Sequence, residues 1–73
     1  MKLRIRELRE SRGLTQAEVA DALLCDQSLY SKYERGLRSL PLEAAVKLAA
    51  YYGVSLDYLT GLTEEESAQA SLP

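Results

Sequence analysis

The stretch from Thr15 to Gly36, TQAEVADALLCDQSLYSKYERG, restricts the fold of this 73-residue chain more than any other segment. It reads as two short helices joined by a tight turn. Thr15 and Glu18 have the spacing of a capping box, in which each side chain satisfies a free backbone donor. Asp26 is placed to cap the second helix, and Gly36 is placed to end it in a left-handed conformation. Helices this short are unstable alone, so we expect the rest of the chain to hold them at a fixed angle.

A helix-turn-helix is the motif that this pattern predicts, although its turn departs from the usual chemistry. Leu24 stands in the turn where Gly would be favoured for a left-handed residue, and this leaves open a slightly different turn geometry. Cys25 follows directly before a helix N-terminus, which tends to lower a thiol pKa. We favour an inert, half-buried thiol at this position over a redox switch.

Three further helices are expected around this pair. Residues 2–12 form a surface helix in which Ile5 and Leu8 face the core. Pro41 is suited to the first position of a fourth helix, and Ser55 to the cap of a short last one. The fourth helix has apolar residues at core spacing: Leu42, Ala45, Val46, Ala49 and Tyr52. The sequence thus predicts an all-α domain of five helices over residues 1–61 and an acidic, flexible tail over residues 62–73.

Composition excludes several classes of site. Seventy-three residues suffice for one small domain with a modest core. There is no His and only one Cys, so we expect no structural zinc site, no internal disulfide and no cofactor. No segment approaches the length of a membrane span, and we expect a cytoplasmic protein with no membrane partner.

Charge is distributed unevenly along the chain. The formal net charge is −2. Residues 1–39 contain eight Lys or Arg and six acids, whereas residues 40–73 contain one Lys and five acids. Such a molecule can present a basic end to phosphates, although an ordinary mixed surface explains the charge pattern equally well.

One face of the second helix in the Thr15–Gly36 stretch has amides, hydroxyls and cations but no acid. Its members follow helical spacing: Gln27, Ser28, Ser31, Lys32 and Arg35. A donor-rich face at a helix start suits the edges of bases and phosphates, whereas a plain solvated face usually mixes both signs. We therefore favour a nucleic-acid contact over a plain surface.

The segments TQAEVADAL, YSKYERG and VKLAAYYGVSLDYLTG occur in this order, and with them the chain resembles the phage Cro and lambda-type repressor (XRE) family over roughly residues 3–61. The resemblance implies a five-helix, lambda-repressor-like DNA-binding domain with its third helix in the major groove. Three positions depart from the family pattern: Leu24 replaces Gly, Tyr30 replaces a smaller residue, and Leu37 occupies a frequent Lys position.

The resemblance also implies site residues. The base-reading positions are Gln27, Ser28, Leu29, Ser31 and Lys32. The phosphate-contacting positions are Gln16, Arg35, Gly36, Arg38 and Ser39. Gln16 is also implied to steady Gln27, and Leu29 is equally well explained by packing. A structural ion pair is implied between Arg9 and Glu34.

We expect a sequence-specific, double-stranded-DNA-binding transcriptional regulator of bacterial or phage origin, most simply a repressor. One recognition helix reads few base pairs, so we expect a homodimer on a pseudo-palindromic operator. The expected dimer surface lies among Tyr51, Tyr58, Leu59 and Leu62, and packing inside the domain is the alternative for Tyr51 or Tyr58. The alternative is an antitoxin-like interaction module, and a protein partner such as an antirepressor or a toxin fits either function. An enzyme is disfavoured because no catalytic constellation is present.

Overall fold

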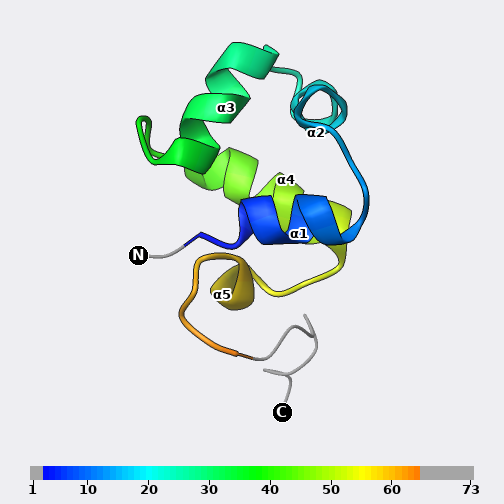
Figure 1. The fold of residues 1–73 in the computed structure, drawn as a ribbon. Coiled ribbons are helices and arrows are strands. Elements are labelled where there is room, and N and C mark those ends of the chain that lie inside the picture. The colour runs from blue at the N-terminus through cyan, green and yellow to red at the C-terminus, as the bar shows by residue number, and fades with distance from the viewer. Residues whose placement is uncertain (1–2, 65–73) are drawn as a thin grey trace.

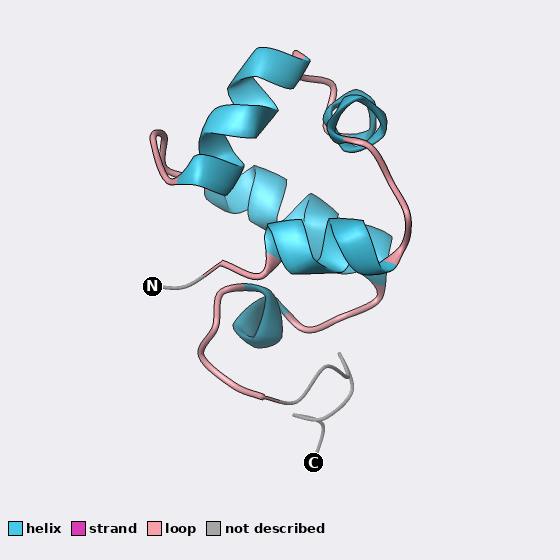
Figure 2. Cartoon of the chain, in the orientation of Figure 1, coloured by secondary structure: helices cyan, strands magenta, loops and turns pink. Residues whose placement is uncertain are grey.

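The computed structural model describes residues 3–64, which form five helices and connecting loops with no strand among them (Figure 2). The helices are α1 (Ile5–Ser11), α2 (Gln16–Ala22), α3 (Gln27–Arg35), α4 (Leu42–Tyr52) and α5 (Leu56–Leu59). The prediction of an all-α, helix-turn-helix fold is therefore confirmed. Residues 65–73, most of the predicted tail, lie outside the described residues.

The α2–α3 pair stands at one end of the molecule. Figure 1 shows α5 at the opposite end, with α1 and α4 between them. Every helix contributes to one core of buried side chains, and the largest fully buried ones are Tyr30, Ile5, Leu48, Leu59 and Val19. The helices are too short to be stable alone, so this shared core fixes the angle between α2 and α3.

Side-chain caps start three of the helices as predicted. The Oγ1 atom of Thr15 accepts the backbone N–H of Glu18 at 3.1 Å, and the Glu18 carboxylate accepts the backbone N–H of Thr15 at 2.8 Å. Asp26 and Ser55 cap α3 and α5 through their side-chain oxygens. Pro41 differs from the prediction: its ψ of 151° is extended, so it is the N-cap of α4 and the helix begins at Leu42.

All five helices end in the same pair of backbone hydrogen bonds, a Schellman motif with one left-handed residue. Four helices use a glycine: Gly13, Gly36, Gly53 and Gly61. Helix α2 uses Leu24, which has a φ of 58°. The N–H of Leu24 donates to the carbonyl of Asp21 and the N–H of Cys25 to that of Ala20, each at 3.0 Å. The turn therefore keeps the conformation that favours Gly, and leucine adopts it at a steric cost.

The buried face of α4 differs from the predicted one. The side chains of Leu42 and Val46 are 70% and 50% exposed, so their assignment to the core was wrong. Leu48, which the prediction omitted, is fully buried together with neighbours on its face. Apolar residues occur on most sides of this helix, so spacing alone could not select the buried stripe.

One member of the predicted dimer surface is also misplaced. Leu59 is fully buried in the core, so it cannot contribute to an interface and that assignment was wrong. Tyr58 is half-buried beneath the guanidinium of Arg4, which lies 4.4 Å from its ring centroid. Tyr51 and Leu62 are exposed, at 49% and 74%.

Arg4 ties the start of the predicted tail to the domain. Its Nε donates to the carbonyl of Tyr58 at 2.9 Å, and its Nη2 donates to the carbonyl of Thr63 at 3.1 Å. The same Nη2 lies 3.3 Å from the carboxylate of Glu64. The chain immediately after residue 61 is therefore fastened to the N-terminal segment.

Candidate nucleic-acid interface

The one acid within α3, Glu34, is turned away from its polar face, and the acid just before the helix, Asp26, is engaged as the N-cap. Asp26 accepts the backbone N–H of Ser28 at 3.1 Å, and the first turn of the helix holds no other acid. The Glu34 side chain is only 2% exposed and faces α1. The outward face of α3 therefore presents donors and cations without a competing carboxylate.

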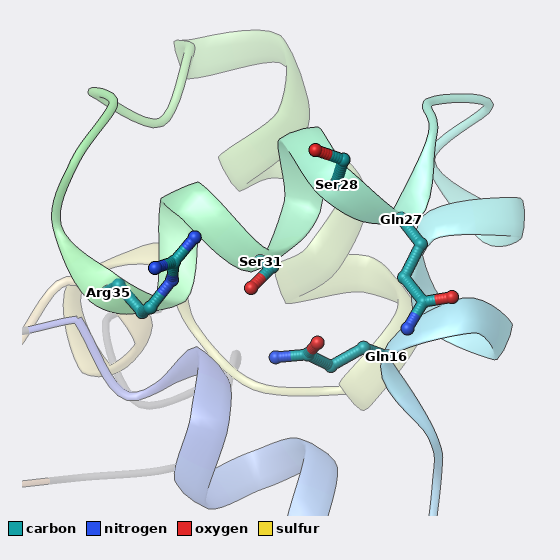
Figure 3. Close-up of a pocket in the computed structure, with 5 residues that line it drawn as sticks. All are labelled: Gln16, Gln27, Ser28, Ser31 and Arg35. Atoms are coloured by element: carbon teal, nitrogen blue, oxygen red, sulfur yellow. The ribbon is translucent and has the colours of Figure 1, made fainter.

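A shallow, open depression runs along α3 beside the start of α2. Four side chains of α3 and one of α2 line it: Gln27, Ser28, Ser31, Arg35 and Gln16. Figure 3 shows Gln16 and Gln27 toward one end, and Arg35 toward the other. The structure thus brings together three of the base-reading candidates and two of the phosphate-contacting candidates.

Two base-reading candidates lie outside this depression. Leu29 is half-buried and packs against the core, which favours its packing role. Lys32 is half-buried and does not line the depression. The remaining phosphate-contacting candidates, Gly36, Arg38 and Ser39, are exposed in the loop between α3 and α4.

The described basic residues fall into two groups. The first is occupied within the protein by acids or carbonyl oxygens, and it comprises Arg4, Arg6, Arg9 and Arg12. The second forms no ion pair with any other residue between positions 3 and 64, and it comprises Lys32, Arg35, Arg38 and Lys47. Three of the four unpaired cations lie on α3 or the loop after it. Fewer basic residues are therefore free to bind phosphates than the sequence suggested.

The ion pair implied between α1 and α3 is present and has two parallel contacts. Nε of Arg9 lies 2.6 Å from Oε2 of Glu34, and Nη2 lies 3.2 Å from Oε1. The third guanidinium nitrogen, Nη1, donates to the carbonyl of Leu14 at 2.9 Å. With 13% of the Arg9 side chain exposed, the pair is shielded from water, so its hydrogen bonds are strong.

These contacts set the ionisation of the cluster. Burial alone would raise the pKa of Glu34, but hydrogen bonding to Arg9, with smaller effects from Tyr30 and Gln16, holds the pKa below its ordinary value. Hydrogen bonding to Glu34 raises the pKa of Arg9. Burial and then the Glu34 carboxylate raise the pKa of Tyr30, although its hydroxyl makes no hydrogen bond of standard geometry. Glu34 is therefore an ionised acceptor at neutral pH.

One contact of this cluster was not predicted from the sequence. Nε2 of Gln16 donates to Oε1 of Glu34 at 3.0 Å, so a residue of the depression is bonded to the buried pair. Nothing in the spacing of these residues indicates the contact, because it joins the starts and ends of different helices. Only the packing of α2 against α3 brings them together.

Cys25 does not behave as its position before a helix suggested. Burial, followed by the neighbouring charge of Asp26, raises the pKa of its thiol above the ordinary value. The expected lowering is therefore wrong, and the inert thiol is the better description.

A family model described as helix-turn-helix matches residues 5–59, a range that includes all five helices. The chain belongs to the helix-turn-helix family. The resemblance to phage Cro and lambda-type repressors is thereby confirmed. No solved structure matches this helix-turn-helix protein.

Curated relatives of this helix-turn-helix protein match most of its length. The cryptic phage CTXphi transcriptional repressor RstR of Vibrio cholerae is 41% identical over 61 residues, which cover 84% of this chain and 55% of the relative. The HTH-type transcriptional regulator ImmR of Bacillus subtilis is 39% identical over 61 residues, covering 84% and 48%. The uncharacterized regulator YobD of Bacillus subtilis is 39% identical over 62 residues, covering 85% and 55%. The chain thus spans about half the length of these relatives.

Two other kinds of site are absent from residues 3–64 of this helix-turn-helix protein. No three Cys, Asp or Glu side chains gather there in a way that would hold a metal ion. None of the described helices has the length and apolar character needed to cross a bilayer.

Proposed function

We propose that this chain is a sequence-specific, double-stranded-DNA-binding transcriptional regulator that represses by occupying its operator. The proposal rests on the difference between basic residues that are bound within the protein and basic residues that are not. The four arginines between residues 4 and 12 each bind an acid or a carbonyl oxygen of the protein, whereas Lys32, Arg35 and Arg38 of α3 and the following loop form no ion pair within residues 3–64. Unpaired cations beside an acid-free helix face suit a polyanion.

The two ends of α3 have different roles in this proposal. Gln27 and Ser28, exposed at the helix start, and Ser31 one turn later read base edges in the major groove, since amides and hydroxyls can donate and accept. Arg35 and Arg38, at the helix end and in the loop, contact phosphates.

The backbone of the loop assists in the same contact. Gly36 has a φ of 75°, and a Cβ there would meet nothing within 4 Å. Glycine is therefore favoured at this position for its backbone conformation, and not because a side chain would clash with a neighbour. Ser39 can donate its hydroxyl to a phosphate oxygen. Gln16 lines the depression together with Arg35 and retains one amide N–H for a phosphate.

The regulatory role is supported by the relatives, two of which are a phage transcriptional repressor and a transcriptional regulator. Because the proposed partner is DNA, the proposal includes a cytoplasmic location for a protein of bacterial or phage origin.

Binding to duplex DNA tests the proposal directly. Fluorescence anisotropy with a random-sequence duplex should show binding at low salt that weakens linearly on a log–log plot as salt rises. Selection from a random duplex library should then enrich one sequence motif. Absence of binding to the random duplex at low salt would contradict the proposed function.

The operator-bound form is a homodimer in this proposal, because one recognition helix reads too few base pairs for specificity in a genome. A two-fold axis would place the two α3 helices about 34 Å apart and require a pseudo-palindrome. Leu62 is the strongest remaining candidate for the dimer surface, since it borders an apolar depression with Leu3, Leu40, Leu42 and Leu56. A selected site without a dyad, or one protomer per site by sedimentation, would exclude the dimer.

A further inference from the structure

Leu24 is an exposed apolar side chain held in a strained backbone conformation. Its φ is 58°, and its side chain is 85% exposed. A left-handed conformation costs a residue with a Cβ free energy that glycine would not lose. Leu24 does not belong to the core or to the side chains packed against it, so packing does not compensate this strain. An uncompensated backbone outlier indicates a role outside the folded chain itself.

A mainly apolar depression lies between α2 and α4, next to this leucine. Its lining comes from the last residue and the C-cap of α2 and from the second half of α4, and comprises Ala22, Leu23, Lys47, Leu48, Ala50 and Tyr51. Leu23 directly precedes Leu24 in the chain. The exposed leucine and the depression are therefore neighbours on one surface.

Two opposite charges belong to the same surface. Lys47 lines the depression, and Asp21 directly precedes Ala22 in α2. Both side chains belong to exposed residues, and neither forms an ion pair within residues 3–64. The six lining residues, Leu24 and Asp21 together form the α2–α4 surface. An apolar centre with charged residues at its rim is typical of a surface that binds protein.

We propose that a second copy of this chain docks on the α2–α4 surface, with Leu24 of each copy in the depression of the other. The surface has both an exposed apolar side chain and a hollow, so one two-fold contact uses both. The same two-fold axis pairs Asp21 of each copy with Lys47 of the other. A different protein would need a hollow for Leu24, an apolar side chain for the depression and two matching charges of its own.

The α2–α4 surface is separate from the two surfaces of the proposed function. Its residues line neither the depression along α3 nor the apolar depression beside Leu62. A copy that is bound to DNA or paired through Leu62 therefore keeps this surface available. The proposed contact is additional to the proposed function and does not depend on it.

The contact should be weak, because the surface is small. It has eight residues a side, whereas a standard interface has roughly 20–30. We therefore expect a Kd on the order of 0.1–1 mM in solution. A contact of this strength requires a method that detects pairing at high protein concentration.

Nuclear magnetic resonance tests the pairing in the full chain with Leu62→Asp, which removes the other proposed dimer contact. Between about 20 μM and about 1 mM protein, the amide signals of residues 21–24 and 47–51 should shift toward saturation. Isotope-filtered spectra of mixed labelled and unlabelled chains should then show contacts between the methyl groups of Leu24 in one copy and the ring of Tyr51 in the other.

A pair of leucine variants tests the apolar part of the contact. Leu24→Gly should weaken the pairing by about tenfold or more, because apolar area is lost on both sides of the axis. The substitution relieves a strained conformation, so loss of pairing would not come from unfolding. Leu37→Gly removes another exposed leucine, from the loop between α3 and α4, and should leave the pairing unchanged.

A charge exchange tests the two-fold arrangement. Asp21→Lys and Lys47→Asp should each prevent pairing, because like charges then meet across the axis. An equal mixture of these two variants should pair again, since every cation then faces an acid. This recovery distinguishes direct contact between copies from an effect of either substitution on the fold.

The inference is overturned if the signals do not change up to about 1 mM, a result that would leave the surface for a different protein. It is also overturned if the shifts are confined to other residues, if the mixed charge variants do not pair, or if Leu37→Gly weakens pairing as much as Leu24→Gly. Failure to bind duplex DNA would contradict the proposed function alone.

Discussion

Arg9 and Glu34 join α1 to the last turn of α3 through a shielded, two-point ion pair, with Nε and Oε2 2.6 Å apart. The side chains come from positions 25 residues apart in the sequence. Charged groups held away from water depend on each other, because either one alone would be buried without compensation. The pair therefore makes the position of α3 depend on α1.

Glu34→Ala should destabilise the fold by about 3 kcal/mol, because it leaves the Arg9 guanidinium partly buried without its partner. For a domain of this size that loss lowers the melting temperature by more than about 10 °C. Thermal unfolding followed by circular dichroism measures it. The matched control is Glu10→Ala, which removes an acid that is 56% exposed and 3.9 Å from Arg9, and should cost less than about 1 kcal/mol. Equal melting temperatures for the unaltered protein and Glu34→Ala would contradict the structural role.

Acid should destabilise the protein through the same residue. The pKa of Glu34 is lower in the folded protein than its ordinary value of 4.5, so the unfolded chain binds more protons in this range. The stability that Glu34 contributes is therefore complete above about pH 4.5 and declines as the pH falls further toward the folded-state pKa. Urea unfolding between pH 3 and 7 measures the decline. It should be shallower in Glu34→Ala, and an unchanged slope would contradict the assignment.

Alkali should destabilise the protein through buried tyrosines. Burial, with the neighbouring Tyr51 and the Glu34 charge, raises the pKa of Tyr52 from 10.0 to about 12. The unfolded chain loses this proton first, so stability should fall as the pH rises from about 10 toward 12. Tyr52→Phe should weaken this fall, and urea unfolding at pH 9 to 11 measures it. Tyr58→Phe, at a half-buried tyrosine outside the groups that raise this pKa, is the control that should leave the fall unchanged.

At neutral pH, Tyr52→Phe should change stability by less than about 1 kcal/mol. The hydroxyl of Tyr52 is buried without a hydrogen-bond partner in the described residues, so its removal sacrifices no bond. The guanidinium of Arg12, 5.3 Å from the ring centroid, can rest on phenylalanine equally well. A loss well above 1 kcal/mol would show that the hydroxyl has a partner.

Leu24→Gly should stabilise the protein by up to about 1 kcal/mol. The substitution relieves the strain of a leucine at a φ of 58°. This strain energy exceeds the free energy lost because glycine gives the unfolded chain more conformational freedom. The side chain is 85% exposed, so little packing is lost. Leu37→Gly is the control, since Leu37 is 61% exposed but lacks a positive φ, and it should stabilise nothing. A lower melting temperature for Leu24→Gly would show that the leucine makes contacts that outweigh its strain.

Gln27 and Arg38 should differ in the kind of DNA contact they make. Gln27→Ala should cost about 1–3 kcal/mol on the selected operator and little on a scrambled duplex. Arg38→Ala should weaken both duplexes alike and reduce the salt slope by about one per protomer. Affinities across a salt series measure both effects. Lys47→Ala removes an unpaired cation from α4, outside the depression, and should leave the slope unchanged. If Gln27→Ala weakened both duplexes equally and Arg38→Ala changed the base preference, α3 would dock in the opposite direction.

Local chemistry determined most of the secondary structure from sequence. Thr15, Asp26 and Ser55 start helices because a side-chain oxygen can satisfy a free N–H a few residues ahead. Gly36 ends α3 because it adopts a left-handed conformation without strain. These interactions span at most a few residues, so the sequence by itself specifies them. The polar face of α3 was predictable for the same reason, since helical spacing fixes which side chains share a side.

The tertiary structure decided which apolar residues are buried and which charges are free. Leu48 is buried and Leu42 exposed, although both lie in one short apolar helix, because burial depends on the neighbouring helices. Leu59 was expected at the surface because the sequence does not show how the neighbouring helices pack. Likewise Arg4 and Arg12, on either side of α1, look available in sequence but bind carbonyl oxygens 59 and 40 residues away. The hydrogen bond from Gln16 to Glu34 belongs to this class, since contacts between distant segments exist only once the core has set the angle between helices.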